Sequence, residues 1–178
     1  MRIFIVENDP EVMRVVQNLS ERGHEVYHAE RLGKAAQLLE FHPKVDYFDL
    51  FFFDVGIPSE RVRHLGDKGM LTYNHHDGFN GLVFLLNNLD ILGTRMNDIT
   101  LITAFKQRVI GLESIDVFGK TFVRERYSKK EDAKRSRSEQ QTKLRYVEMG
   151  TDNNYALTFI DKSGDGFDAL LDRFIHRR

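Results

Sequence analysis

Acidic side chains that directly follow short apolar runs are the first candidates for chemistry in this chain. Asp54 ends the apolar run at residues 48–53, and Glu7 and Asp9 follow the run at residues 2–6. Doubly wound sheets place their ligands at the carboxyl ends of their strands. Carboxyl groups that converge there repel one another and need a divalent cation, and hard oxygen ligands suit magnesium. Taken alone, Asp54 could equally cap a loop or the following helix.

The elements that must position these residues alternate between strands and helices. The run from Leu50 to Phe53, with Phe48 shortly before it, is apolar without interruption, as a parallel strand is when helices cover both of its faces. The same reading predicts strands at residues 2–6 and 25–29 and helices at residues 10–22 and 32–41. This βαβαβ order predicts a parallel sheet with right-handed crossovers.

Three later segments continue the alternation. Residues 77–89 begin with Asp-Gly and continue as an apolar helix, and residues 99–104 form an apolar run that ends in Thr103 and Ala104. Residues 116–122 read as a further strand. The sequence therefore predicts a third helix, a fourth strand and a fifth strand.

In this order, the motifs resemble the receiver domain of two-component response regulators. That family has an acidic pair after strand one and a phospho-accepting Asp after strand three, with Pro four residues later. It has Thr or Ser followed by Ala after strand four, and Lys after strand five. Residues 6–10 (VENDP) and 53–58 (FDVGIP) match the first two motifs. The resemblance covers residues 1–58, residues 77–122 and the last helix.

The resemblance implies an α/β fold with a doubly wound, five-stranded parallel sheet of the flavodoxin-like receiver type. It implies a single receiver-like domain over residues 1–178, with insertions after strands three and five. The first insertion covers residues 59–76. The second covers residues 123–163 and joins a basic segment to a β-hairpin. Residues 165–177 are expected to form the closing amphipathic helix.

The resemblance also assigns roles to the candidate residues. Asp54 would attack a phosphoryl group in line and form an acyl phosphate. Lys120 and the Thr103 hydroxyl would bind the phosphoryl oxygens and stabilise their charge. The enzymatic activity would be limited to two reactions: self-phosphorylation from a phosphodonor, and autodephosphorylation, in which water hydrolyses the acyl phosphate. Magnesium would be held by Glu7, Asn8, Asp54 and Gly56, with Asp9 in place of Asn8 if the loop is shifted.

Several positions depart from the family pattern. Asn8 stands where the direct metal ligand is normally a carboxylate, so magnesium affinity should fall. Thr121 replaces the usual Pro after the Lys, and Val117 replaces the usual aromatic residue before it. The shortened span between Thr103 and Lys120 predicts a fourth helix clipped by about one turn. Two hypotheses follow: a phosphorylatable receiver, or a degenerate receiver that binds partners without phosphate.

A second lysine competes for the place beside Asp54. Residues 156–161, followed by Lys162, also read as a fifth strand with its Lys. On that assignment residues 104–155 are one long insertion. We prefer Lys120, because residues 116–122 keep an Asp near the Lys and a Phe two residues after it.

The two insertions carry less specific signals. Residues 59–76 hold His64, His75 and His76. We prefer to interpret them as part of a solvated insertion, with a lid over the site as the alternative and a metal site as the weakest interpretation. Residues 123–145 are strongly basic and would contact nucleic acid or form a solvated charged segment. Residues 144–149 and 155–160 predict a β-hairpin.

Composition excludes several classes of protein. The net charge of −1 argues against a general nucleic-acid binder, and the absence of cysteine excludes disulfides and zinc–thiolate sites. We found neither a signal peptide nor a membrane span, so we expect a cytoplasmic protein. The expected partners are a histidine kinase or histidine phosphotransfer protein and a downstream protein target, and a homodimer is compatible with the sequence.

Overall fold

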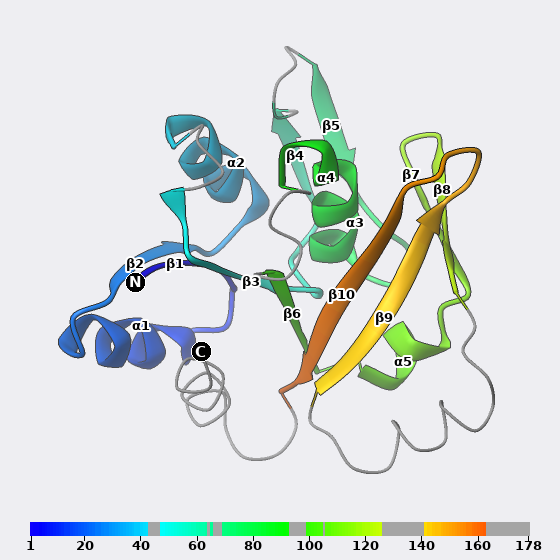
Figure 1. The fold of residues 1–178 in the computed structure, drawn as a ribbon. Helices are drawn as coiled ribbons and strands as arrows, with labels where there is room; N and C mark the ends of the chain where they lie inside the picture. Colours follow the sequence, from blue (N-terminus) through cyan, green and yellow to red (C-terminus); the bar gives the residue numbers. More distant parts are fainter. Residues whose placement is uncertain are drawn as a thin grey trace.

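The computed structural model describes residues 1–42, 47–63, 65, 69–92, 99–104, 106–125 and 141–162. It is an α/β protein in which helices pack alongside a mixed sheet of eight strands (Figure 1). The predicted closing helix at residues 165–177 and most of the basic segment lie outside the described residues. Within the described part of the chain, every helix falls short of the length and hydrophobicity of a membrane span.

The eight strands of the main sheet divide into a parallel half and an antiparallel half. In spatial order they are β2 (Glu25–Ala29), β1 (Arg2–Val6), β3 (Leu50–Asp54), β6 (Ile99–Thr103), β10 (Asn154–Asp161), β9 (Gln141–Glu148), β8 (Lys120–Arg124) and β7 (Ser114–Val117). The strands from β2 to β10 pair in parallel. The strands from β10 to β7 pair antiparallel.

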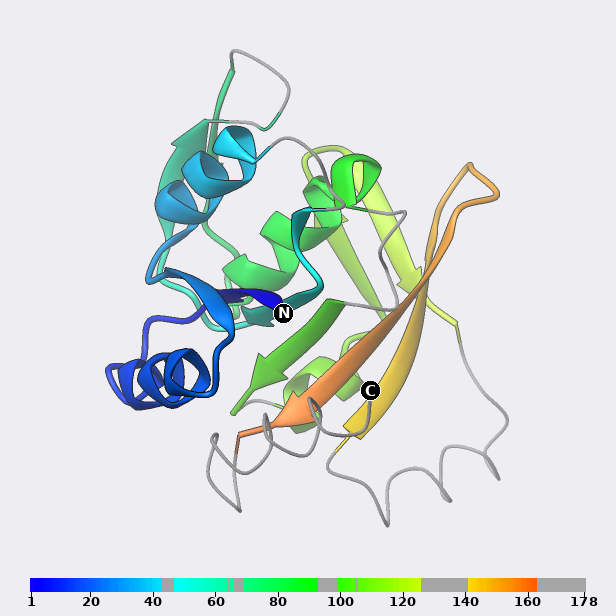
Figure 2. The same ribbon diagram turned by 60° about the vertical axis from the view of Figure 1, so that its left-hand side comes forward.

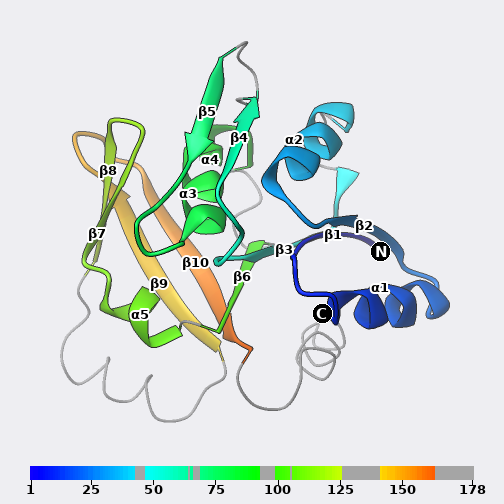
Figure 3. The ribbon, with the colours of Figure 1, turned by 180° about the vertical axis from the view of Figure 1, so that it is seen from behind.

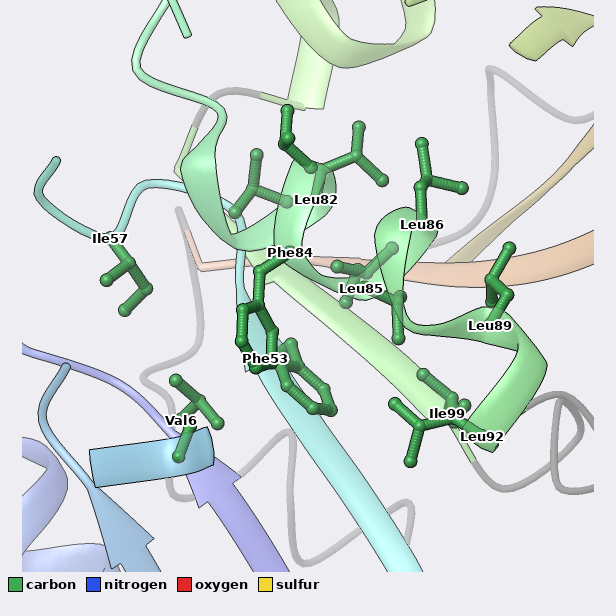
Figure 4. Packing of buried hydrophobic residues seen from close by; sticks show 14 of the residues in the cluster. Val6, Phe53, Ile57, Leu82, Phe84, Leu85, Leu86, Leu89, Leu92 and Ile99 are labelled. Atoms are coloured by element: carbon green, nitrogen blue, oxygen red, sulfur yellow. The ribbon is translucent and has the colours of Figure 1, made fainter. Parts of the chain in front are cut away.

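The central strands of the parallel half, β1, β3 and β6, are buried on both faces, as their apolar runs predict. Successive residues of β1 point to opposite sides, so Ile3 packs with α1 (Val12–Glu21) and Phe4 packs in the larger cluster on the other face. That larger cluster includes Phe53 of β3, Leu85 of α3 and Ile99 of β6, which are labelled in Figure 4. The helices other than α1 are α2 (Leu32–Phe41), α3 (Asn80–Asn87), α4 (Leu89–Leu92) and α5 (Lys106–Gly111).

The first four predicted strands and the first three predicted helices are confirmed, but the preferred fifth strand is wrong. Residues 116–122 do not join the parallel half. They belong to the antiparallel hairpin of β7 and β8, at the far edge of the sheet. The turn consists of Phe118 and Gly119, both with positive φ (46° and 85°), which is the geometry of a two-residue type I′ hairpin.

The fifth parallel strand is β10, which lies beside β6 in both Figures 1 and 2. The predicted hairpin at residues 144–149 and 155–160 is confirmed as β9 and β10. The segment predicted as the second insertion, residues 123–163, therefore contains the last parallel strand instead of following it. The strands β7, β8 and β9 precede β10 in the chain and extend the sheet, so the protein is not a simple five-stranded flavodoxin-like sheet.

The insertion at residues 59–76 forms a second, two-stranded antiparallel sheet of β4 (Glu60–Arg63) and β5 (Met70–Tyr73). β4 packs against α2 and β5 against α3, as the view from behind shows (Figure 3). Val62 and Tyr73 are buried in these contacts. The insertion is thus part of the packed structure, and it begins only a few residues after Asp54.

Candidate functional site

Four polar residues lie at the carboxyl ends of four adjacent parallel strands. Glu7 directly follows β1, Asp54 ends β3, Thr103 ends β6 and Lys162 directly follows β10. Because these strands are neighbours and run in the same direction, their ends meet at one edge of the sheet. All four residues are at most partly exposed, and Glu7, Asp54 and Thr103 are buried.

Lys162 joins the two acidic residues of this site. Its Nζ forms an ion pair with Glu7 Oε2 and lies 3.3 Å from Asp54 Oδ2. Its backbone N–H donates to the carbonyl oxygen of Thr103 at 3.0 Å, which extends the pairing of β10 with β6 by one residue. The lysine is therefore held in place by the backbone as well as by the carboxylates.

Lys120, the lysine that we preferred from the sequence, lies elsewhere. It is the first residue of β8, and its Nζ is 3.6 Å from Asp90 Oδ2 and 3.6 Å from Glu148 Oε1. The structure brings the competing lysine, Lys162, to Asp54 instead. The reason is the strand order, because β10 lies next to β6 and β8 is separated from β10 by β9.

Backbone groups of the adjoining loops orient both carboxylates. The Asp9 N–H donates to Glu7 Oε1 at 3.0 Å, and the Gly56 N–H donates to Asp54 Oδ1 at 3.1 Å. Each acid therefore has one oxygen held by a loop N–H and the other oxygen toward Lys162. This arrangement presents one oxygen of Asp54 toward the positive charge.

The start of α3 packs directly against the backbone of Asp54. Gly81 N–H donates to the carbonyl oxygen of Val55 at 3.1 Å, and a Cβ on Gly81 would lie 1.8 Å from the Asp54 carbonyl oxygen. Only a glycine permits this approach. Sequence reasoning missed this role, although a glycine inside a predicted apolar helix was a signal for a close backbone contact.

Asn80 joins two loops near the site through hydrogen bonds of its side chain. Sequence reasoning did not identify this role. Its side chain is buried, its Nδ2 donates to the Ile57 carbonyl oxygen at 2.9 Å, and its Oδ1 accepts from the His75 N–H at 2.6 Å. The loop after Asp54 is thereby attached to the loop before α3. We see no sequence signal that distinguishes Asn80 from an ordinary helix-capping asparagine.

The charge balance of the site is reflected in Glu7. Burial raises the pKa of its carboxyl group, and the nearby charge of Asp54 raises it further, while Lys162 acts in the opposite direction. The net direction is upward, because burial and the charge of Asp54 together outweigh the effect of Lys162 on the Glu7 pKa.

The oxygen donors of the site fit a magnesium ion in part. Glu7 Oε2 is buried and in direct contact with the Lys162 ammonium group, and Asp54 supplies a second charged oxygen near the same group. Hard carboxylate oxygens are the ligands that magnesium prefers. Asn8 is exposed beside Glu7, and the Asp9 carboxylate caps the Glu11 N–H at 3.0 Å. Two charged ligands are present, with the Gly56 backbone next to Asp54.

The histidine-bearing loop forms a separate group. His64 lies outside the described residues, but ligand atoms of His75, His76 and Asp77 lie within 4.8 Å of one another. Asp77 Oδ1 accepts from Arg108 at 2.7 Å, and its Oδ2 lies 3.0 Å from His76 Nε2. Both oxygens of the acid are therefore engaged, and burial lowers the pKa of His75.

A comparison of the chain with protein-family models and with curated proteins found no match.

Proposed function

We propose that the protein is a receiver-like signalling protein in which Asp54 accepts a phosphoryl group. The observation that carries this proposal is the placement of Lys162 3.3 Å from Asp54, with Glu7 and Thr103 on the neighbouring strand ends. The parallel strand order β2-β1-β3-β6-β10 supports it, because the flavodoxin-like doubly wound order of receivers is 2-1-3-4-5. The antiparallel extension by β9, β8 and β7 is the departure from that order.

The proposed reaction is an in-line displacement at phosphorus. An oxygen of the Asp54 carboxylate forms a bond to phosphorus as the bond to the donor's leaving group breaks, and the product is an acyl phosphate. Lys162 pairs with a phosphoryl oxygen and Thr103 positions its hydroxyl at the same strand edge, so charge is stabilised by fixed groups. Magnesium, bound through Glu7, Asp54 and the Gly56 backbone, would screen the negative charge between nucleophile and phosphoryl group.

In this proposal the phosphodonor is a histidine kinase or a histidine phosphotransfer protein in the cytoplasm. The output is a change in the protein's own surface, which a downstream protein reads. Phosphorylation of Asp54 would draw Lys162 from Glu7 toward the phosphoryl group. The Lys162 N–H donates a hydrogen bond to Thr103, and Asn80 donates one to Ile57 in the loop after Asp54. A movement at the phosphoryl group would therefore be transmitted to β10 and to α3.

A second candidate function is a degenerate receiver that binds partners without phosphate. Two observations favour it. Asn8 is uncharged where the family has a metal-binding carboxylate, and Lys162 already pairs with both acids of the site. In that case the site would be structural, and the function would lie in the inserted strands.

Intact mass spectrometry distinguishes the two candidates. The wild-type protein is incubated with magnesium and acetyl phosphate, alongside Asp54→Ala and, as a matched control, Asp152→Asn at an exposed aspartate of the β9–β10 turn. We expect one phosphoryl adduct on wild type and on Asp152→Asn, and none on Asp54→Ala. The absence of an adduct on wild type, together with the absence of magnesium binding, would exclude phosphotransfer and leave the degenerate receiver.

A further inference from the structure

The turn between β5 and α3 gathers three side chains that can bind a metal ion. Ligand atoms of His75, His76 and Asp77 lie within 4.8 Å of one another. The Gly78 N–H donates to the His75 carbonyl oxygen at 2.8 Å and closes a four-residue turn, in which Gly78 has a φ of 76°. We call His75, His76 and Asp77 the histidine turn.

The donor atoms of the histidine turn are those that divalent transition metals prefer. Two imidazole nitrogens and one carboxylate oxygen suit Zn²⁺, Ni²⁺ and Co²⁺, whereas Mg²⁺ prefers oxygen ligands alone. A zinc ion with three protein ligands takes a water molecule as its fourth ligand. Solvent reaches the histidine turn, because the His76 side chain is 81% exposed and the Asp77 side chain is 30% exposed.

His76 and Asp77 already have the spacing of two ligands on one metal ion. His76 Nε2 lies 3.0 Å from Asp77 Oδ2. Zinc bonds of about 2.0–2.2 Å to nitrogen and oxygen place neighbouring ligand atoms about 3.0–3.5 Å apart. A metal ion would therefore take the place of the proton between these two atoms without a large movement of either side chain.

Neighbouring elements orient two of the three ligands. Arg108 of α5 donates to Asp77 Oδ1 at 2.7 Å, while Asp77 Oδ2 faces His76. A hydrogen bond to the second oxygen of a carboxylate is the usual support of a metal ligand. The ring of His75 stacks on Phe79 with 5.5 Å between centroids and an interplanar angle of 12°. The Asp77 carboxylate and the His75 ring are thus held by protein contacts before an ion binds.

His75 needs only a small change to become the third ligand. Its Nδ1 accepts from the Asp77 N–H at 3.2 Å, so this nitrogen is unprotonated and directs its lone pair toward its own turn. A metal ion at Nδ1 would replace one long hydrogen bond. The His75 backbone N–H donates to Asn80 Oδ1 at 2.6 Å, which anchors the residue to the start of α3. Rotation of the exposed His76 side chain can close the remaining separation.

We propose that the histidine turn binds one divalent transition-metal ion of the class of Zn²⁺ through His75, His76 and Asp77. The site shares no ligand with the oxygen site at Asp54, takes a different class of metal and does not depend on phosphorylation. The sequence alone suggested the histidines, and the structure adds Asp77 with its support from Arg108.

Isothermal titration of the full chain with ZnCl₂ at pH 7.5 tests the proposal. Excess Mg²⁺ is present throughout, so that the oxygen ligands at Asp54 are offered the metal they prefer. We expect one equivalent of Zn²⁺ to bind with a Kd below about 100 µM. His76→Gln and Asp77→Asn should each weaken this binding at least about tenfold, because each removes one ligand. The exposed position of His76 separates the loss of a ligand from a loss of the fold.

A second metal and a control variant make the test specific. With Co²⁺ as the probe, wild type should develop the visible absorption bands of a nitrogen-ligated ion, and His76→Gln should lose them. His24→Gln removes an imidazole just before β2 and should leave both measurements unchanged. The proposal is overturned if Zn²⁺ does not saturate the wild-type protein up to about 1 mM, or if His24→Gln weakens binding as much as His76→Gln. Unchanged binding in His76→Gln and Asp77→Asn would overturn it as well.

Discussion

The backbone of Gly81 lies against the carbonyl oxygen of Asp54, where a Cβ would come within 1.8 Å. The first turn of α3 therefore fixes the position of the proposed nucleophile through main-chain contact. The Gly81 N–H bond to Val55 reinforces this contact at the next residue. α3 is consequently a structural support of the site as well as a core helix.

Gly81→Ala should destabilise the protein by about 1–3 kcal/mol, because backbone must move to admit the methyl group. The displacement also moves Asp54, so we expect slower formation of the phosphoryl adduct. Urea unfolding and the mass assay with acetyl phosphate measure the two effects. Gly111→Ala is the control, since a Cβ there meets no atom within 4 Å. Equal stability of both variants would contradict the close contact.

Substitution of Lys162 should lower the free energy of unfolding much more than substitution of Lys120. Lys162→Met leaves Glu7 and Asp54 buried without their cation and should destabilise the protein by about 2–4 kcal/mol at neutral pH. Lys120→Met breaks ion pairs of a 39% exposed side chain and should cost no more than about 1 kcal/mol.

The stability of Lys162→Met relative to wild type should also depend on pH. The stability deficit of Lys162→Met should shrink as the pH is lowered from 7 toward 5, because Glu7 can then take up a proton. Urea unfolding at both pH values measures this. In the phosphorylation assay, Lys162→Met should lose the adduct and Lys120→Met should keep it. Loss of the adduct in Lys120→Met alone would restore the original assignment of the lysine.

The contribution of Glu7 to the free energy of unfolding should decrease as the pH rises. Its pKa is raised above the usual 4.5, so the folded state holds this proton more tightly than the unfolded state. The stabilising contribution is therefore complete below about pH 4.5 and is lost as the pH rises through the higher pKa of the folded state.

Glu7→Gln isolates this effect, since its amide has no proton to lose. The free energy of unfolding of wild type minus that of Glu7→Gln should decrease with pH, by at most about 1.4 kcal/mol per pH unit. Glu30→Gln, at an exposed glutamate, provides the baseline for the measurement. A difference that does not change with pH would show that Glu7 is not perturbed.

Phe118 adopts a backbone conformation that L-residues rarely take, with φ 46° in the β7–β8 turn. Its half-exposed ring packs edge-on against Tyr73 of β5 at 5.2 Å between centroids. Asn tolerates this conformation and β-branched residues do not. Phe118→Asn should therefore stay within about 1 kcal/mol of wild type, and Phe118→Val should be about 1–2 kcal/mol less stable than Phe118→Asn. Thermal and urea unfolding of the two variants test the order, and equal stability would argue against the type I′ turn.

Much of the parallel half was predictable because its signals are local. The strands β1, β3 and β6 are continuous apolar runs, and the polar residue at each carboxyl end follows directly in the sequence. A run that is buried on both faces has no amphipathic period and can be recognised without knowing its partners. The assignment of these three runs as parallel strands places Glu7, Asp54 and Thr103 at one edge of the sheet.

The two candidate fifth strands differ in how they are buried in the folded protein. In β10, Phe159 and Ile160 are buried in succession, as in a strand covered on both faces. In β7, Ile115 and Val117 are buried while their neighbours are exposed, which is the alternation of an antiparallel strand with one wet face.

The sequence by itself determined which residues end the first four strands, because strand runs and their terminal side chains are neighbours along the chain. Only the tertiary structure decided which lysine faces Asp54, since that depends on β10 rather than β8 pairing with β6 across a long insertion. The contact of Gly81 with Asp54 is of the same kind, because it arises from packing between distant segments, which no local pattern specifies.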